Sequence, residues 1–150
     1  MKVPEFLFVI VNPIMKMILR SPLHFIFSSG VMLITFTGRK SGKTFTTPVR
    51  YVSDGDTVRC FSSDVNRWWK NIRGGAEVVL RIKTSEARYS ARLIEDDPVE
   101  VGKWLRVYLE AFPEDAVYHD IRRTKDKQGF VESDVEEAIK HAVVVEATPV

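Results

Sequence analysis

The sequence predicts an α+β fold, a six-stranded antiparallel β-barrel with flanking helices. Runs of β-branched and aromatic residues alternate with polar ones, as in half-buried strands, at residues 31–37, 45–52, 57–62, 77–82, 87–95 and 142–145. Most connections between these runs are too short to hold the crossover that parallel strands require, so neighbouring strands are expected to be antiparallel. Helical patterns precede, interrupt and follow the strands, which favours a barrel covered by helices.

The composition is that of one globular domain without covalent cross-links. The chain has 150 residues, of which 45% are hydrophobic and 28% charged, enough to bury a core. We expect a single domain over residues 1–150, with a helical leader at 1–28 and the barrel with its helices at 29–150. Cys60 is the only cysteine and the three histidines are scattered, which predicts no disulfide and no metal site and fits a reducing cytoplasm.

The first residues are apolar but broken. Asn12-Pro13 is typical of a helix start and Ser21-Pro22 of a helix end. The apolar run is shorter than a membrane-spanning helix needs, and no signal-peptide cleavage pattern follows it. Three alternatives stay open: the segment covers the core, residues 1–20 lie against a membrane surface, or the segment contacts a second copy of the chain. The protein is accordingly expected in the cytoplasm, with membrane association as the alternative.

The first two strands, at 31–37 and 45–52, enclose a glycine-containing turn at 38–43. Pro48 lacks a backbone N–H, so it marks a strand edge or a bulge. A hairpin signal at 53–56 leads to the strand at 57–62. Asp64 is then expected to cap a helix over 65–73, which Gly74-Gly75 would end.

The second half continues with three strands and three helices. Asp97-Pro98 and Glu100 form a capping box for a helix with its apolar stripe at Val101, Trp104, Leu105, Tyr108 and Leu109. Pro113 ends that pattern, and a short helix at 115–123 is expected to carry Tyr118. A second capping box, Ser133 with Glu136, predicts an acidic helix before the last strand.

The turn at 38–43 carries the clearest functional pattern. Its glycines permit a concave nest of backbone N–H groups, and Arg39, Lys40 and Lys43 add positive charge beside it. This favours a grip on a phosphate or a polyanion, with a solvated hairpin tip as the alternative. The turn is not a P-loop, because three residues rather than four separate Gly38 from Gly42 and a strand follows. The formal net charge of +2 gives no support for nucleic acid, and the segment lacks an exposed aromatic array.

Several short motifs in this order resemble the deazaflavin-dependent nitroreductase family. They are Thr37-Gly38-Arg39-Lys40-Ser41-Gly42-Lys43, Thr46-Thr47-Pro48, Tyr51-Val52, Asp54-Gly55-Asp56 and Trp68-Trp69-Lys70-Asn71-Ile72. The resemblance extends over about residues 28–95. It implies a split β-barrel like those that bind FMN, and an oxidoreductase that passes a hydride from reduced coenzyme F-420 to a quinone, a nitroaromatic compound or an activated alkene.

The resemblance also implies the roles of residues. The phosphate and polyglutamate tail of the coenzyme would be held by Arg39, Lys40, Ser41, Gly42 and Lys43. The rest of the coenzyme site would be formed by Thr47 and Pro48 near the deazaflavin ring, Cys60 and Ser62 on the third strand, and Trp68 and Asn71 on the short helix. Tyr118 is the candidate catalytic residue, as a proton donor or an orienting group, with water as the alternative proton source.

The sequence departs from the family pattern at three places. Ser63 stands where members often carry a Lys, residues 64–67 replace a glycine-rich loop, and Phe45 stands where some members have a basic residue. Each change removes an anion contact, for which Arg67, Lys70 or Arg73 are candidates to compensate. Two alternatives follow: an FMN-dependent reductase of the same fold, or a non-catalytic module that binds a cofactor, haem or lipid.

The expected partners are a small-molecule electron acceptor and a second copy of the chain. No Ser/His/Asp constellation is visible in the sequence. This agrees with a reaction in which the cofactor supplies the chemistry and the protein supplies binding and orientation.

Overall fold

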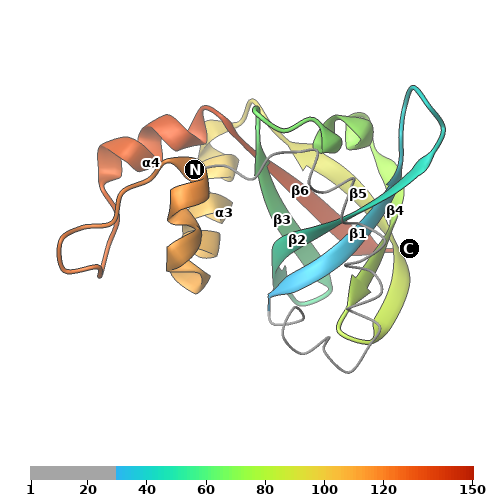
Figure 1. Cartoon of the computed structure of the whole chain (residues 1–150), viewed down its shortest axis with the longest axis horizontal. Helices are drawn as coiled ribbons and strands as arrows, with labels where there is room; N and C mark the ends of the chain where they lie inside the picture. Colours follow the sequence, from blue (N-terminus) through green and yellow to red (C-terminus); the bar gives the residue numbers. More distant parts are fainter. Residues whose placement is uncertain (1–29) are drawn as a thin grey trace.

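The computed structural model describes residues 30–150, so the expectations for residues 1–28 lie outside the described residues. Six strands form a closed antiparallel barrel in the order β1-β2-β3-β6-β5-β4 (Figure 1). Their bounds are β1 (Val31–Thr37), β2 (Thr44–Asp54), β3 (Thr57–Ser63), β4 (Ala76–Ile82), β5 (Ser85–Ile94) and β6 (Ala142–Pro149). The antiparallel barrel predicted from the strand pattern and the short connections is confirmed.

Within residues 30–150, four helices accompany the barrel: η1 (Trp68–Ile72), α3 (Pro98–Ala111), η2 (Pro113–His119) and α4 (Glu132–Ile139), of which η1 and η2 are 3₁₀-helices. Figure 1 shows α3 and α4 together on one side of the barrel, away from the β1–β2 turn. In the described residues, no helix is long and apolar enough to cross a membrane.

The alternation of side chains along the strands divides the apolar residues into two clusters. The barrel interior holds Ile34, Leu80, Val143 and other inward residues of the strands. The second cluster lies between the barrel wall and the helices, where Val144 packs with α3 and α4 residues. Because β6 turns Val143 inward and Val144 outward, one strand contributes to both clusters.

The pairing of β2 explains the position of Pro48. β1 pairs with β2 over the stretch from Thr44 to Arg50, and Pro48 lies opposite Leu33. β3 pairs with β2 only from Tyr51 to Asp54. Within the described ladders, the side of Pro48 that faces away from β1 therefore has no strand partner, which confirms the predicted edge position.

Three expected helix boundaries need correction. Asp64 does not cap a helix at 65–73; a 3₁₀-helix begins at Trp68 without a side-chain cap, because the Asp64 carboxylate pairs with His141 instead. The predicted Ser133–Glu136 capping box is wrong, since α4 begins at Glu132 with no side-chain cap. The helix expected at 115–123 runs instead from Pro113 to His119 and ends at Asp120, whose backbone is left-handed. The Asp97 cap is confirmed: its carboxylate accepts the Glu100 N–H at 3.2 Å.

Candidate functional site

The β1–β2 turn is closed by its own backbone. Gly38 N–H donates to the Lys43 carbonyl at 2.7 Å, and Gly42 N–H donates to the Gly38 carbonyl at 2.9 Å. A Cβ on Gly38 would lie 2.7 Å from the ring of Phe45, so this position requires glycine. Lys43 N–H donates to Ser41 Oγ at 3.1 Å. These three N–H groups are used inside the turn and do not line an anion nest, so the side-chain cations are the stronger candidate anion contacts.

The turn is docked onto η1 by hydrogen bonds. Arg39 N–H donates to Asn71 Oδ1 at 2.9 Å, and the Arg39 guanidinium donates to the Lys70 carbonyl at 3.0 Å. Asn71 Nδ2 in turn donates to the Trp68 carbonyl at 2.9 Å. The amide of Asn71 therefore joins two segments that lie 32 residues apart in the sequence. Its observed contacts hold the turn in place.

We call the cations that this docking gathers the basic platform: Arg39, Lys40 and Lys43 on the turn, with Arg67 and Lys70 at η1. All five are exposed, and in the described part of the chain none has a carboxylate within ion-pair distance. Arg73, the third candidate to compensate for the missing anion contacts, is different. Its guanidinium forks onto the carboxylate of Glu95, with a shortest distance of 2.9 Å, so it serves a structural pair.

The remaining predicted coenzyme residues lie on or inside the barrel wall. Thr47 is buried and its Oγ1 has no hydrogen-bond partner among residues 30–150, whereas Pro48 on the outer face is half-buried. Cys60 packs in the barrel core, and burial raises the pKa of its thiol to about 12. Burial thus keeps this thiol protonated at neutral pH, and its observed contacts are those of a core residue. Ser62 is buried and accepts a hydrogen bond from Asn66 at 3.2 Å.

Trp68 belongs to the same core. Its side chain is 5% exposed, and its ring centroid lies 5.7 Å from that of Phe36. The ring therefore packs η1 against the barrel core. Trp69 is also buried, and its indole N–H donates to the Ser63 carbonyl at 2.8 Å. The structure thus brings Trp68 and Asn71 together with the turn, while the side chains of Thr47, Cys60 and Ser62 point elsewhere.

Tyr118 lies on η2, which follows α3 on the side of the barrel away from the turn (Figure 1). Its side chain is exposed. Three residues earlier, the buried carboxylate of Asp115 accepts two hydrogen bonds from the guanidinium of Arg50 and one from the hydroxyl of Tyr108. Hydrogen bonding to Asp115 raises the pKa of Arg50, and burial followed by the charge of Asp115 raises the pKa of Tyr108. No local pattern in the sequence indicated this network.

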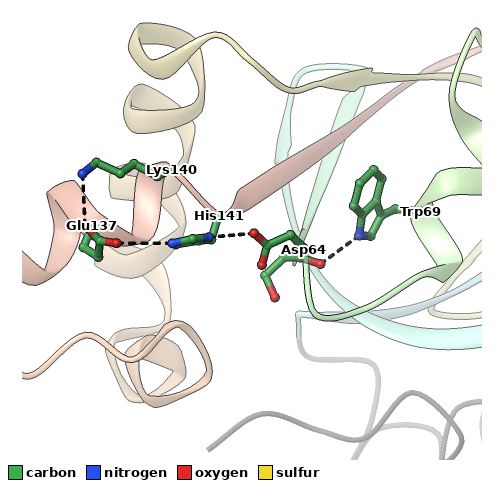
Figure 2. Close-up of polar contacts among 6 residues, drawn as sticks. Asp64, Trp69, Glu137, Lys140 and His141 are labelled. Carbon is green, nitrogen blue, oxygen red and sulfur yellow. Dashed lines mark hydrogen bonds and ion pairs between the residues drawn. The ribbon is translucent and has the colours of Figure 1, made fainter.

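A second network fixes the segment between β3 and η1 (Figure 2). His141 Nδ1 lies 2.6 Å from the Asp64 carboxylate, and His141 Nε2 lies 3.3 Å from that of Glu137. Lys140 pairs with the same Glu137 at 3.2 Å. Hydrogen bonding to the Asp64 carboxylate, and then to that of Glu137, raises the pKa of His141. This link attaches the segment between β3 and η1 to the start of β6. Over residues 30–150, no group of histidine, cysteine and carboxylate side chains is arranged to hold a metal ion.

Comparison with protein families decides the class of chemistry. The family model described as F420H(2)-dependent quinone reductase matches residues 23–127. The chain belongs to this family. It is an oxidoreductase that uses reduced coenzyme F-420, as the motif resemblance implied. A search of curated proteins found no match.

Solved structures confirm the split-barrel fold. One, described as an F420-H2 Dependent Reductase (FDR-A), is 21% identical, with a TM-score of 0.52 over 79% of this chain and 94% of the other. Another, described only as a domain-swapped dimer, is 21% identical, with a TM-score of 0.54 over 91% and 96% of the two chains. A putative pyridoxamine 5'-phosphate oxidase from Listeria innocua is 15% identical, with a TM-score of 0.51 over 91% and 93%.

The residues of the turn fit the coenzyme that the family uses. A phosphate with a polyglutamate tail carries several negative charges. The basic platform presents five exposed cations that no described carboxylate neutralises, two of them arginines able to fork onto a phosphate or carboxylate. The charge of the platform therefore fits this anion, and contact between the two stays a prediction.

Proposed function

We propose that the protein transfers a hydride from reduced coenzyme F-420 to a small electron acceptor: a quinone, a nitroaromatic compound or an activated alkene. The coenzyme supplies the hydride when bound, and the chain supplies binding, orientation and a proton. The basic platform holds the phosphate and tail, while the edge of β2 at Thr47 and Pro48 lies beside the ring. Cys60 and Ser62 contribute through the third strand, and Tyr118 serves as the proton donor or orienting group.

The observation that carries this proposal is that the five cations of the basic platform have no carboxylate partner among the described residues. Unpaired cations on one surface repel one another, and a multivalent anion relieves that repulsion. The three cations of the turn come from a hairpin that is held against η1 by hydrogen bonds to the Asn71 side chain and the Lys70 carbonyl. The platform is therefore largely formed before the ligand arrives, which reduces the ordering cost of binding.

The proposal extends to the whole chain. We propose one domain over residues 1–150 that acts in the cytoplasm, with a homodimer as the assembly. The domain-swapped dimer among the structural neighbours supports a dimer through the shared fold. Light scattering of the purified protein measures the assembly directly, and a monomer at all concentrations would contradict this part.

A fluorescence titration with oxidised coenzyme F-420, and separately with FMN, tests the function. We expect Lys43→Ala and Lys40→Ala each to weaken deazaflavin binding roughly fivefold, about 1 kcal/mol for a charge-assisted contact. Arg88→Ala is the matched control, because Arg88 is also exposed but pairs with Glu77 at 3.2 Å on another face. Binding should also weaken as salt rises.

The titration separates the alternatives. Binding of FMN but not of the deazaflavin would replace the proposal by an FMN-dependent reductase of the same fold. Deazaflavin binding without turnover of quinone, nitro or alkene acceptors would favour a binding module. Equal weakening of deazaflavin binding by Lys43→Ala and Arg88→Ala would mean that the basic platform is not part of the coenzyme site.

A further inference from the structure

One buried carboxylate attaches η2 to the barrel. Asp115 is 3% exposed, and its two oxygens accept from Arg50 Nε at 3.0 Å and Arg50 Nη2 at 3.1 Å. The hydroxyl of Tyr108 donates to the same carboxylate at 2.8 Å. The guanidinium carbon of Arg50 also lies 4.3 Å from the centroid of the Phe112 ring, just before η2. Such a forked pair fixes direction as well as distance.

The geometry of η2 transmits this attachment to Tyr118. In a 3₁₀-helix, side chains three residues apart eclipse one another, so Asp115 and Tyr118 share one face. Tyr118 keeps 38% of its surface exposed, so its ring remains open to a ligand while the carboxylate beneath it is buried.

The other end of the pair is on the strand that borders the proposed ring site. Side chains two residues apart on a strand share a face, so Arg50 and Pro48 both lie on the outer face of β2. The fork between Arg50 and Asp115 therefore sets the position of η2 relative to the strand that carries Pro48. Glu114 does not duplicate this contact, since it is exposed and 4.0 Å from Arg50 at its nearest.

We propose that Arg50 and Asp115 are positioning residues for Tyr118, holding its hydroxyl at the acceptor side of the coenzyme site. The inference rests on the proposed function, in which Tyr118 donates a proton to the acceptor or orients it. The pair touches neither coenzyme nor acceptor in this scheme. It acts through η2 alone, so its removal should change turnover and leave coenzyme binding unchanged.

Steady-state kinetics with a quinone acceptor test the proposal. We expect Tyr118→Phe to lower kcat about tenfold or more, as removal of a general acid does. Asp115→Asn and Arg50→Lys should lower kcat several-fold, with the dissociation constant of coenzyme F-420 within about twofold of the wild-type value. In the Tyr118→Phe background the same substitutions should have no further effect on kcat, because residues that act through one another are not additive.

Glu132→Gln is the control for a merely structural effect, since it breaks the ion pair between Arg106 and Glu132, which joins α3 to α4. The proposal is overturned if Asp115→Asn lowers kcat equally with and without Tyr118, or if Glu132→Gln lowers it as much. If Asp115→Asn is too unstable to assay, Arg50→Lys, which keeps the charge, gives the same decision.

A second readout does not depend on the coenzyme. With 3-fluorotyrosine placed at position 118 of the full chain, the ¹⁹F resonance should move in Asp115→Asn and Arg50→Lys but not in Glu132→Gln. An unmoved resonance in all three variants would refute the positioning role. Failure of the wild-type protein to bind coenzyme F-420 would refute the proposed function instead, and the ¹⁹F result would still stand by itself.

Discussion

The helical side of the barrel and the basic platform differ in how their charged side chains are paired. On the helical side, five arginines pair with carboxylates: Arg50 with Asp115, Arg59 and Arg92 with Glu146, Arg106 with Glu132, and Arg122 with Asp134. On the basic platform, five exposed cations have no described carboxylate partner. Paired charges join elements of the fold to one another, whereas unpaired ones cost little when exposed and remain available to a ligand. Charge is structural on one side of the molecule and is proposed to be functional on the other.

Removing one partner on each side should give the largest contrast. Asp115→Ala takes away a buried carboxylate and leaves the Arg50 guanidinium and the Tyr108 hydroxyl without their shared acceptor. We expect it to lower the free energy of unfolding by about 3 kcal/mol. Lys43→Ala removes only an exposed cation, so its effect should stay within about 0.5 kcal/mol. Urea unfolding of both variants measures the difference. Similar destabilisation in the two variants would mean that the platform is also structural.

Sequence reasoning located the platform because its signals are local. Gly38, Arg39 and Lys43 occur within one turn, and strands flank it with a period of two. The same period predicted the barrel, and in β5 Ala91 lies in its interior cluster while Tyr89 and Leu93 pack against that cluster. Patterns of this kind depend on neighbours in the chain and are readable without coordinates.

Contacts between distant segments could not be read in this way. Arg50 and Asp115 lie 65 residues apart, and Arg39 and Asn71 lie 32 apart. Asp64 shows why this matters: beside a helical pattern it has the form of an N-cap, yet His141, 77 residues away, takes its carboxylate. The N-cap prediction failed there because His141, from a distant segment, binds the Asp64 carboxylate instead. Asn71 was predicted as a coenzyme contact; its observed partners hold the turn, and contact with the coenzyme stays a prediction.

Detaching the turn from η1 should have a moderate effect. Asn71→Ala removes the acceptor for Arg39 N–H and the donor to the Trp68 carbonyl. Two hydrogen bonds of this kind contribute about 1–2 kcal/mol, so coenzyme F-420 should bind roughly tenfold more weakly because the platform is no longer preformed. Fluorescence titration measures this. Asn66→Ala is the control, since Asn66 bonds only the buried Ser62 hydroxyl through its side chain among the described contacts. Equal weakening in both variants would point to general loosening of the β3–η1 segment.

The smallest effect is expected at the link between His141 and Asp64, because both side chains are about half exposed (Figure 2). The pKa of His141 is raised above 6.5, first by the Asp64 hydrogen bond and then by Glu137. A raised folded-state pKa means that the stabilisation is fully present below the unfolded value and disappears as the pH rises through the folded value. The stability advantage of wild type over His141→Gln should therefore shrink between about pH 5 and about pH 8.

Urea unfolding of both proteins across this range measures that difference, and Asp64→Asn sharpens it. Because Asp64 is the first cause of the raised pKa, Asp64→Asn should flatten the pH dependence more than Glu137→Gln does. Coenzyme binding should weaken slightly in both variants, and more in Asp64→Asn than in Glu137→Gln. The effect should be small because the link supports only the approach to η1, while Asn71 holds the turn itself. If the stability advantage of wild type over His141→Gln grew with rising pH instead, His141 would be neutral in the folded protein. The link between His141 and Asp64 would then not be an ion pair.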